Sequence, residues 1–321
     1  MDPRPPHVLP RSPQEALPWF GAESLRGASV AWRFTREQPV SVVAVKATYD
    51  LDPATGALAL RQDGLPVTGD EYTGEPPMSS LRYASDLAII KARCDVLVWG
   101  LAQGGGERSV ELRARFGDPD RSGRGFDRRM RVIGRHIGGG TQAEPFDVLA
   151  PTWELAPFDG RDNPVGCRTS EGLPAQLSWV EGSGPVGFGP RPMMWPCRLR
   201  AFGTYDERWY KTRYPYFAED FDPAAFQTAP PEQQLKALAG DEPFCFEGFF
   251  PEQRQVTGEL PGVQAHIYTV AGGEVGGAFS EVPVRLDTVH FDLEAMVVSL
   301  VWRGSVAVDD DDASNLIALY G

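Results

Sequence analysis

Glycine and proline recur along this chain at a density that excludes long helices. There are 35 glycines and 29 prolines among 321 residues, together roughly a fifth of the chain where about an eighth is typical. Proline removes a helical hydrogen bond and glycine weakens a helix interior, so helical segments must stay short. The hydrophobic share of 42% still provides a sizeable core. The sequence therefore predicts a mainly β protein: an antiparallel sandwich or distorted barrel with long ordered loops and a few short helices.

Strand patterns occur towards both ends of the chain. Residues 30–34 alternate between large apolar side chains and small or charged ones, as in a half-buried strand. Residues 40–49 are β-branched and aromatic and precede the turn-forming segment 52–56, which predicts a hairpin with the strand around residues 58–60. Further strands are predicted at 86–99, 110–116, 130–133, 264–270 and 292–302. Of these, 110–116 and 130–133 flank a turn-rich segment and should pair antiparallel.

The middle of the chain, residues 144–231, shows little periodicity but many glycines, prolines and aromatic residues. Four of the eight tryptophans lie here: Trp153, Trp179, Trp195 and Trp209. Large rings in a solvated linker would favour aggregation. We therefore predict ordered loops that lie over a sheet.

Three regions are expected along the chain: an irregular arm at 1–20, a single β-rich domain at 21–308, and an acidic segment with a short helix at 309–321. Residues 231–240 begin with proline and an acid and end with glycine, which predicts a short helix. Residues 313–320 follow four consecutive acids and form a second candidate helix.

Charge and cysteine usage limit the partners of this chain. The formal net charge of −13 repels nucleic acid and anionic membranes. The four cysteines lie far apart without a C-x-x-C pair, so we expect free thiols in a reducing compartment. No secretory signal and no run of about 20 apolar residues is visible in the sequence. We expect a cytoplasmic protein that binds no nucleic acid directly and no membrane.

One local basic patch stands out against the acidic background. Residues 108–135 contain nine arginines and four acids. On the predicted strand pair, many of these arginines should face outward, where they form either a solvated surface or a partner-binding site. The partner-binding candidates are Arg113, Arg115, Arg124, Arg128 and Arg129.

Evidence for catalysis is thin. Asp206, Asp220 and Asp222, with Asn163, could form a carboxylate cluster for a divalent metal. The same residues lie in sequences typical of tight turns, in which Asp and Asn side chains bond the local backbone. The sequence contains neither a G-x-S-x-G nucleophile motif nor a phosphate-binding loop. We expect no catalytic residue, metal or cofactor, and keep a metal-dependent hydrolase using the three aspartates as the alternative.

A series of short motifs in fixed order distinguishes the middle of the chain. They are Asn163-Pro164-Val165-Gly166, Pro185-Val186-Gly187-Phe188-Gly189-Pro190, Trp195-Pro196-Cys197-Arg198, Gly203-Thr204-Tyr205-Asp206-Glu207-Arg208-Trp209 and Asp220-Phe221-Asp222. With earlier and later motifs over residues 25–305, this series resembles an uncharacterised bacterial family encoded in type VI secretion gene clusters.

The resemblance implies a function. Members of that family look like effector adaptors or chaperones, which bind a toxic effector and help load it onto the VgrG spike protein. The resemblance assigns either the partner surface or the stabilisation of the fold to eleven residues: Asn163, Pro164, Gly166, Phe188, Trp195, Arg198, Gly203, Asp206, Trp209, Asp220 and Asp222. The loop at 156–160 departs from the family pattern, so the partner of this protein could differ in kind.

Overall fold

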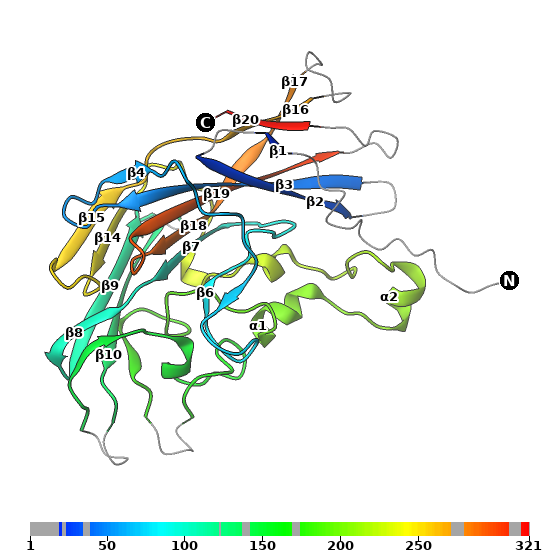
Figure 1. Cartoon of the computed structure of the whole chain (residues 1–321). Coiled ribbons are helices and arrows are strands. Elements are labelled where there is room, and N and C mark those ends of the chain that lie inside the picture. Colours follow the sequence, from blue (N-terminus) through cyan, green and yellow to red (C-terminus); the bar gives the residue numbers. More distant parts are fainter. Residues whose placement is uncertain are drawn as a thin grey trace.

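Two large β-sheets dominate the computed structural model (Figure 1). The structure describes residues 19–20, 24–34, 39–121, 123–136, 142–168, 174–270, 279–307 and 316–320. Among the described helices, none has the length and apolar character needed to cross a membrane.

The first large sheet has seven strands. Its order is β13 (Gln234–Leu235), β7 (Cys94–Trp99), β18 (Val284–Asp292), β19 (Val297–Ala307), β3 (Pro39–Leu51) and β2 (Leu25–Arg33), with β4 (Leu58–Leu60) also pairing with β3. Only β7 and β18 pair in parallel among these strands. The predicted hairpin at 40–60 is confirmed: Asp52 closes its turn by accepting hydrogen bonds from Ala54 N and Thr55 Oγ1.

The second large sheet has five antiparallel strands. Its order is β12 (Leu177–Glu181), β10 (Gly125–Ile133), β9 (Ser109–Gly117), β14 (Pro243–Glu247) and β15 (Gln255–Glu259). The β9–β10 pair confirms the antiparallel pair predicted from residues 110–133.

Three smaller sheets complete the described strands. They are β1 (Trp19–Phe20), β20 (Leu316–Tyr320), β16 (His266–Val270) and β17 (Phe279–Val282); β8 (Ala102–Glu107) with β11 (Phe146–Leu149); and β5 (Glu71–Tyr72) with β6 (Leu81–Tyr83). The helices are α1 (Pro196–Leu199), α2 (Glu207–Thr212) and the 3-10 turns Trp153–Leu155, Arg200–Phe202, Pro223–Phe226 and Pro231–Gln233.

One continuous hydrophobic core lies between the two large sheets. Phe291 of β18 contacts the rings of Phe116, Phe244 and Phe246 on the five-stranded sheet, with centroids 4.8–6.0 Å apart. The buried cluster extends from Leu25 to Trp302. Side chains of two sheets that interdigitate in this way define a β-sandwich, and no described sheet closes on itself into a barrel.

The two helices predicted at 231–240 and 313–320 do not form, so both predictions are wrong. In the segment 231–240, only a 3-10 turn forms, because Gln234 and Leu235 pair with Asp95 and Cys94 of β7. In the segment 313–320, residues 316–320 form strand β20 between β16 and β1. Pairing with distant strands overrides local helix propensity at both places. The four consecutive acids at 309–312 lie outside the described residues.

The strand predicted at 292–302 is interrupted. A turn after Asp292 separates β18 from β19, and Met296 in it has a positive φ of 55°. The strand predicted at 86–99 begins only at Cys94. All four cysteines are present as thiols, as expected; Cys94 and Cys245 are buried, whereas Cys167 and Cys197 are partly exposed.

Candidate functional site

Buried charges attach two loop segments, residues 86–91 and 227–228, to the face of the seven-stranded sheet that points away from the core. Asp95 of β7 is 0% exposed and lies 2.8 Å from Lys91 Nζ. Its carboxylate also accepts hydrogen bonds from Thr228 N at 2.8 Å and Gln227 Nε2 at 2.8 Å. Burial by itself would raise the pKa of Asp95, but the Lys91 ammonium and these donors outweigh it and hold the pKa below its ordinary value. Asp95 therefore stays ionised and ties the loop at 227–228 to the sheet.

A second buried ion pair attaches the segment before β7. Arg303 Nε donates to Asp287 Oδ2 at 2.6 Å, and Arg303 NH1 donates to the carbonyls of Asp86 at 2.7 Å and Ala88 at 2.8 Å. Lys46 Nζ lies 3.0 Å from Asp86 Oδ2. All four charged side chains are nearly inaccessible to solvent. This face of the sheet is thus polar and buried. The alternation of residues along a single strand would instead predict that its polar face is exposed to solvent.

Several motif residues hold the loops to one another. Asn163 Nδ2 donates to the carbonyls of Trp153 at 2.8 Å and Pro157 at 3.0 Å. Arg198 Nε donates to Ala225 O at 3.0 Å, and burial lowers the pKa of Arg198 to about 10. Trp195 contacts Trp153 edge-on, with ring centroids 5.6 Å apart.

The remaining residues of the Asn-Pro and Gly-Phe-Gly motifs lie in the same loops. A Cβ at Gly166 would come within 2.5 Å of Asn163 Nδ2, so glycine is required for this approach. Pro164 is half-buried beside it, and Phe188 is buried against Trp179. These positions stabilise the loops from inside and present no exposed chemistry.

The three aspartates of the hydrolase alternative bind three separate stretches of the chain and do not converge. Asp206 accepts from Trp209 N at 2.8 Å as the N-cap of α2, and Asp222 accepts from Ala224 N at 2.8 Å. Asp220 accepts from Thr204 N and Thr204 Oγ1, both at 2.8 Å, and these bonds lower its pKa. Among the described residues, no three His, Cys, Asp or Glu side chains are placed to share a metal ion. The geometry assigns the three carboxylates to capping and turn closure.

The basic patch is largely neutralised by neighbouring acids. Arg113 lies 2.6 Å from Asp127 and 2.9 Å from Glu247 across adjacent strands. Arg129 lies 3.6 Å from Glu181. Of the five candidate arginines, Arg115 and Arg124 are exposed.

Arg128 does not face outward as predicted. It is 2% exposed, its guanidinium carbon lies 3.9 Å from the centroid of the Trp179 ring, and it donates to Gln233 Oε1 at 2.7 Å and Ser183 O at 3.0 Å. Burial lowers the pKa of Arg128 to about 10. The sequence contains the signal for this placement, because Arg128 shares its strand face with the apolar Phe126 and Met130.

A projecting segment carries the exposed aromatic residues of the motif region. We call residues 203–222 the aromatic arm; Figure 1 shows α2 at its tip, away from the sheets. Tyr205, Tyr210 and Tyr214 are 45%, 55% and 37% exposed. The ring of Trp209 lies edge-on to Tyr205 at 4.7 Å and to Tyr214 at 5.5 Å, and Tyr210 contacts Tyr214 at 5.6 Å. The sequence motifs singled out Trp209 but did not predict that these three tyrosines are exposed together.

The aromatic arm is closed at its base. The Asp220–Thr204 hydrogen bonds join its two ends. Gly203 has a φ of +88°, and a Cβ there would lie 2.5 Å from Asp220 Oδ1. Phe217 stacks on Phe221 with centroids 4.0 Å apart and contacts Trp32 of β2 at 4.8 Å. Compact loops with closed ends and their own packing are frequently functional.

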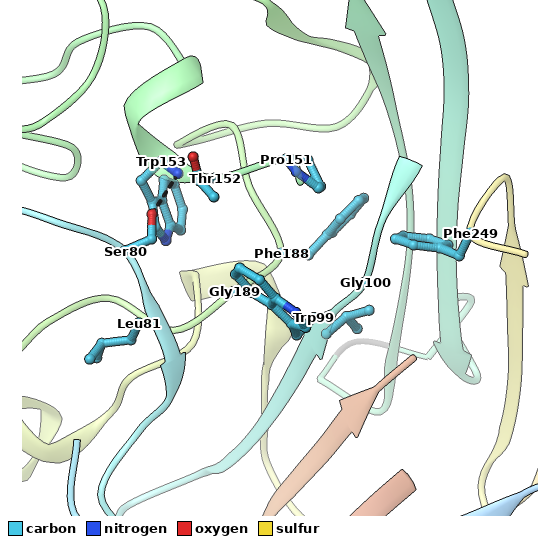
Figure 2. A pocket seen from close by; sticks show the side chains of 11 residues that line it. Ser80, Leu81, Trp99, Gly100, Pro151, Thr152, Trp153, Phe188, Gly189 and Phe249 are labelled. Atoms are coloured by element: carbon cyan, nitrogen blue, oxygen red, sulfur yellow. Dashed lines mark hydrogen bonds between the residues drawn. The ribbon is translucent and has the colours of Figure 1, made fainter. Parts of the chain in front are cut away.

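Figure 2 shows a notch beside the end of β7, with Trp153, Phe188 and Phe249 among its lining residues. Its volume of about 10 Å³ has room for a single water molecule. Pockets for small molecules typically measure about 300–1,000 Å³. The notch is therefore too small for a metabolite.

Comparison with known proteins gives one family. The sequence matches "Uncharacterized protein conserved in bacteria (DUF2169)" over residues 36–303. This span includes the five-stranded sheet, the motif loops, the aromatic arm and the seven-stranded sheet apart from β2 and the last residues of β19. No curated protein and no solved structure matches the chain. The expected membership of an uncharacterised bacterial family is thereby confirmed: the protein belongs to this DUF2169 family.

Proposed function

We propose that this protein is a non-enzymatic adaptor that binds a type VI secretion effector through its aromatic arm and helps load it onto the VgrG spike. The secretion context comes from the sequence resemblance. The observation that carries a binding role is the cluster that Trp209 forms with the exposed Tyr205, Tyr214 and, through Tyr214, Tyr210 on a closed, projecting segment. Tyrosine and tryptophan are enriched at protein interfaces and among the few residues that supply most of the binding energy.

The charges of the arm favour an apolar contact at its centre. Arg208 lies 3.0 Å from Glu219, and Lys211 lies 2.5 Å from Glu207. These exposed pairs add little stability by themselves. Because these charged side chains pair with one another, the exposed tyrosine rings of α2 and its flanking residues are the groups most available to a partner.

The construction of the arm also favours binding. Trp209 Nε1 donates to Tyr216 O at 2.8 Å, so the central ring has a fixed position. A surface that is ordered before binding loses less conformational entropy when the partner arrives. Phe217 also contacts Trp32 of β2 at 4.8 Å, so the base of the arm is held against the sheet.

Co-purification from the native host tests the proposal. The wild-type protein and a Tyr205→Ser/Tyr210→Ser/Tyr214→Ser variant would be affinity-purified and their partners identified by mass spectrometry. We expect the wild type to recover a toxin and VgrG, and the variant to lose most of both. The matched control is Val148→Ser/Val180→Ser, which changes exposed apolar residues on β11 and β12. Recovery of neither partner by the wild type, or equal recovery by the triple variant, contradicts the proposal.

A further inference from the structure

The exposed rings of the aromatic arm suit a particular class of ligand. The ring planes of Tyr205 and Tyr214 stand at 76° and 79° to that of Trp209, so neighbouring rings present both faces and edges. Within the described part of the chain, no hydrogen bond engages the hydroxyls of Tyr205, Tyr210 and Tyr214. Aromatic surfaces with free hydroxyl donors bind proline-rich extended segments, whose rings pack on the aromatics while their carbonyls accept hydrogen bonds.

This chain contains such a segment. Residues 1–18, which lie outside the described part of the chain, include six prolines. Two P-x-x-P sequences occur, Pro3-Arg4-Pro5-Pro6 and Pro10-Arg11-Ser12-Pro13, and each contains an arginine. We propose that residues 1–18 bind the exposed rings of the aromatic arm and compete there with the partner.

Chain length permits this contact. The segment is attached at Trp19, and Trp32, thirteen residues later in the sequence, contacts Phe217 of the arm. Thirteen residues span at most about 45 Å. Eighteen residues in a polyproline II conformation span about 56 Å. The segment is therefore long enough to reach Phe217 at the base of the arm from its attachment point.

Charge also favours the contact. The arm has five acids and three bases, a net charge of −2: Asp206, Glu207, Glu219, Asp220 and Asp222 against Arg208, Lys211 and Arg213. The two P-x-x-P sequences contain Arg4 and Arg11 and no acid, whereas Asp2 and Glu15 lie outside them and balance the charge of the whole segment. The complementarity is therefore local to the P-x-x-P sequences, where arginine pairs well with carboxylates.

Covalent attachment makes even a weak contact effective. A short tether gives an effective concentration of about 1 mM, so a contact with a dissociation constant of about 0.1 mM is formed roughly nine-tenths of the time. A competing partner then binds about tenfold more weakly than it would to the open arm. The segment thus acts as a built-in competitor that only a tighter partner displaces.

Hydroxyl-radical footprinting of the full-length protein, read by mass spectrometry, tests occupancy without any partner. We expect the oxidation rates of Tyr205, Tyr210 and Tyr214 to rise up to about tenfold in a Pro3→Ala/Pro6→Ala/Pro10→Ala/Pro13→Ala variant. A second variant, Arg4→Glu/Arg11→Glu, should raise them too. Ser12→Ala/Gln14→Ala is the matched control and should leave them unchanged. A synthetic peptide of residues 1–18, added to the proline variant at millimolar concentration, should lower the rates again.

Equal tyrosine oxidation in the wild type and both variants overturns the inference. The competition rests on the proposed function, and its test is separate: the proline variant should bind the effector about tenfold more tightly than the wild type. If the tyrosines become exposed but no effector binds either protein, the proposed function fails while the intramolecular contact stands.

Discussion

Lys91 Nζ and Asp95 Oδ2 form an ion pair of 2.8 Å at a place where neither side chain reaches solvent. Lys91 Nζ also donates to Thr288 Oγ1 at 2.8 Å, so the pair joins the segment before β7 to β18. Charges as deeply buried as these are stable only with full hydrogen bonding, which the loop residues Gln227 and Thr228 supply. The pair therefore couples the loops to the sheet.

Removing one partner of this pair should be strongly destabilising. Asp95→Ala leaves the Lys91 ammonium buried without a counter-charge, and we expect a loss of about 3–5 kcal/mol in the free energy of unfolding. The double variant Lys91→Met/Asp95→Leu should lose less than Asp95→Ala alone, because no charge remains buried. Urea denaturation at pH 7 measures both. A double variant less stable than the single one would show that the pair itself is strongly stabilising.

The burial of His290 should make the protein less stable as the pH is lowered. This side chain is buried near Lys46, Arg82 and Asp292, and burial, the largest influence, lowers its pKa to about 3. Because the unfolded chain takes up the proton near pH 6.5 and the folded protein does not, the unfolded state binds more protons between pH 6.5 and 3. The free energy of unfolding should therefore decrease as pH falls through this window, by up to about 1.4 kcal/mol per pH unit.

Urea denaturation from pH 7.5 to 4.5 measures this dependence. The control is His290→Gln, which should be less stable at pH 7.5 but should show a shallower slope between pH 6.5 and 4.5. Asp95 has a lowered pKa in the folded protein, so the stability that its ionised form contributes is lost only as pH falls below the ordinary pKa of an aspartate and through the folded pKa. This loss lies at more acidic pH than the window assigned to His290. Identical slopes for wild type and His290→Gln would assign the effect to other groups.

Arg128 and Arg115 lie on neighbouring strands and should respond differently to alanine. Arg128→Ala removes the ring stacking on Trp179 and leaves the carbonyls of Ser183 and Pro185 without their donor, so we expect a loss of about 2–4 kcal/mol. Arg115→Ala changes an exposed side chain and should stay within about 0.5 kcal/mol of the wild type. Thermal and urea denaturation compare the two. Equal stability of both variants would contradict the structural role of Arg128.

The closure of the aromatic arm should depend on Gly203 and Asp220. Gly203→Ala places a Cβ at a positive φ and against Asp220 Oδ1, which should cost about 1 kcal/mol or more. Asp220→Ala removes both bonds to Thr204 and should increase hydrogen exchange across residues 204–216 while the β9–β10 strands keep their protection. Asp222→Ala, which affects only the next turn, is the control. Unchanged exchange in Asp220→Ala would show that aromatic packing alone closes the arm.

Sequence patterns correctly predicted the strands and hairpins that are determined by residues close together in the chain. The hairpin at 40–60 follows from a β-branched run and an Asp-x-x-x-Gly turn, and β9–β10 from two apolar runs around a turn. Residues 231–240 carry helix signals, yet Leu235 pairs with Cys94, 141 residues away in the sequence. The inward position of Arg128 was readable from strand parity. The exposed tyrosines were not, because burial of an aromatic ring depends on what packs against it.

Composition and periodicity determined that this chain folds into β-strands joined by ordered loops, since frequent glycine and proline exclude long helices and alternating residues favour half-buried strands. The motif order determined the family. Only the tertiary structure decided that Asp220 bonds Thr204 across the base of the aromatic arm, and that Tyr205, Tyr210 and Tyr214 lie together on the surface. The physical reason is that loop closure and ring exposure arise from contacts between residues distant in sequence, whereas strand, turn and capping preferences act between neighbours.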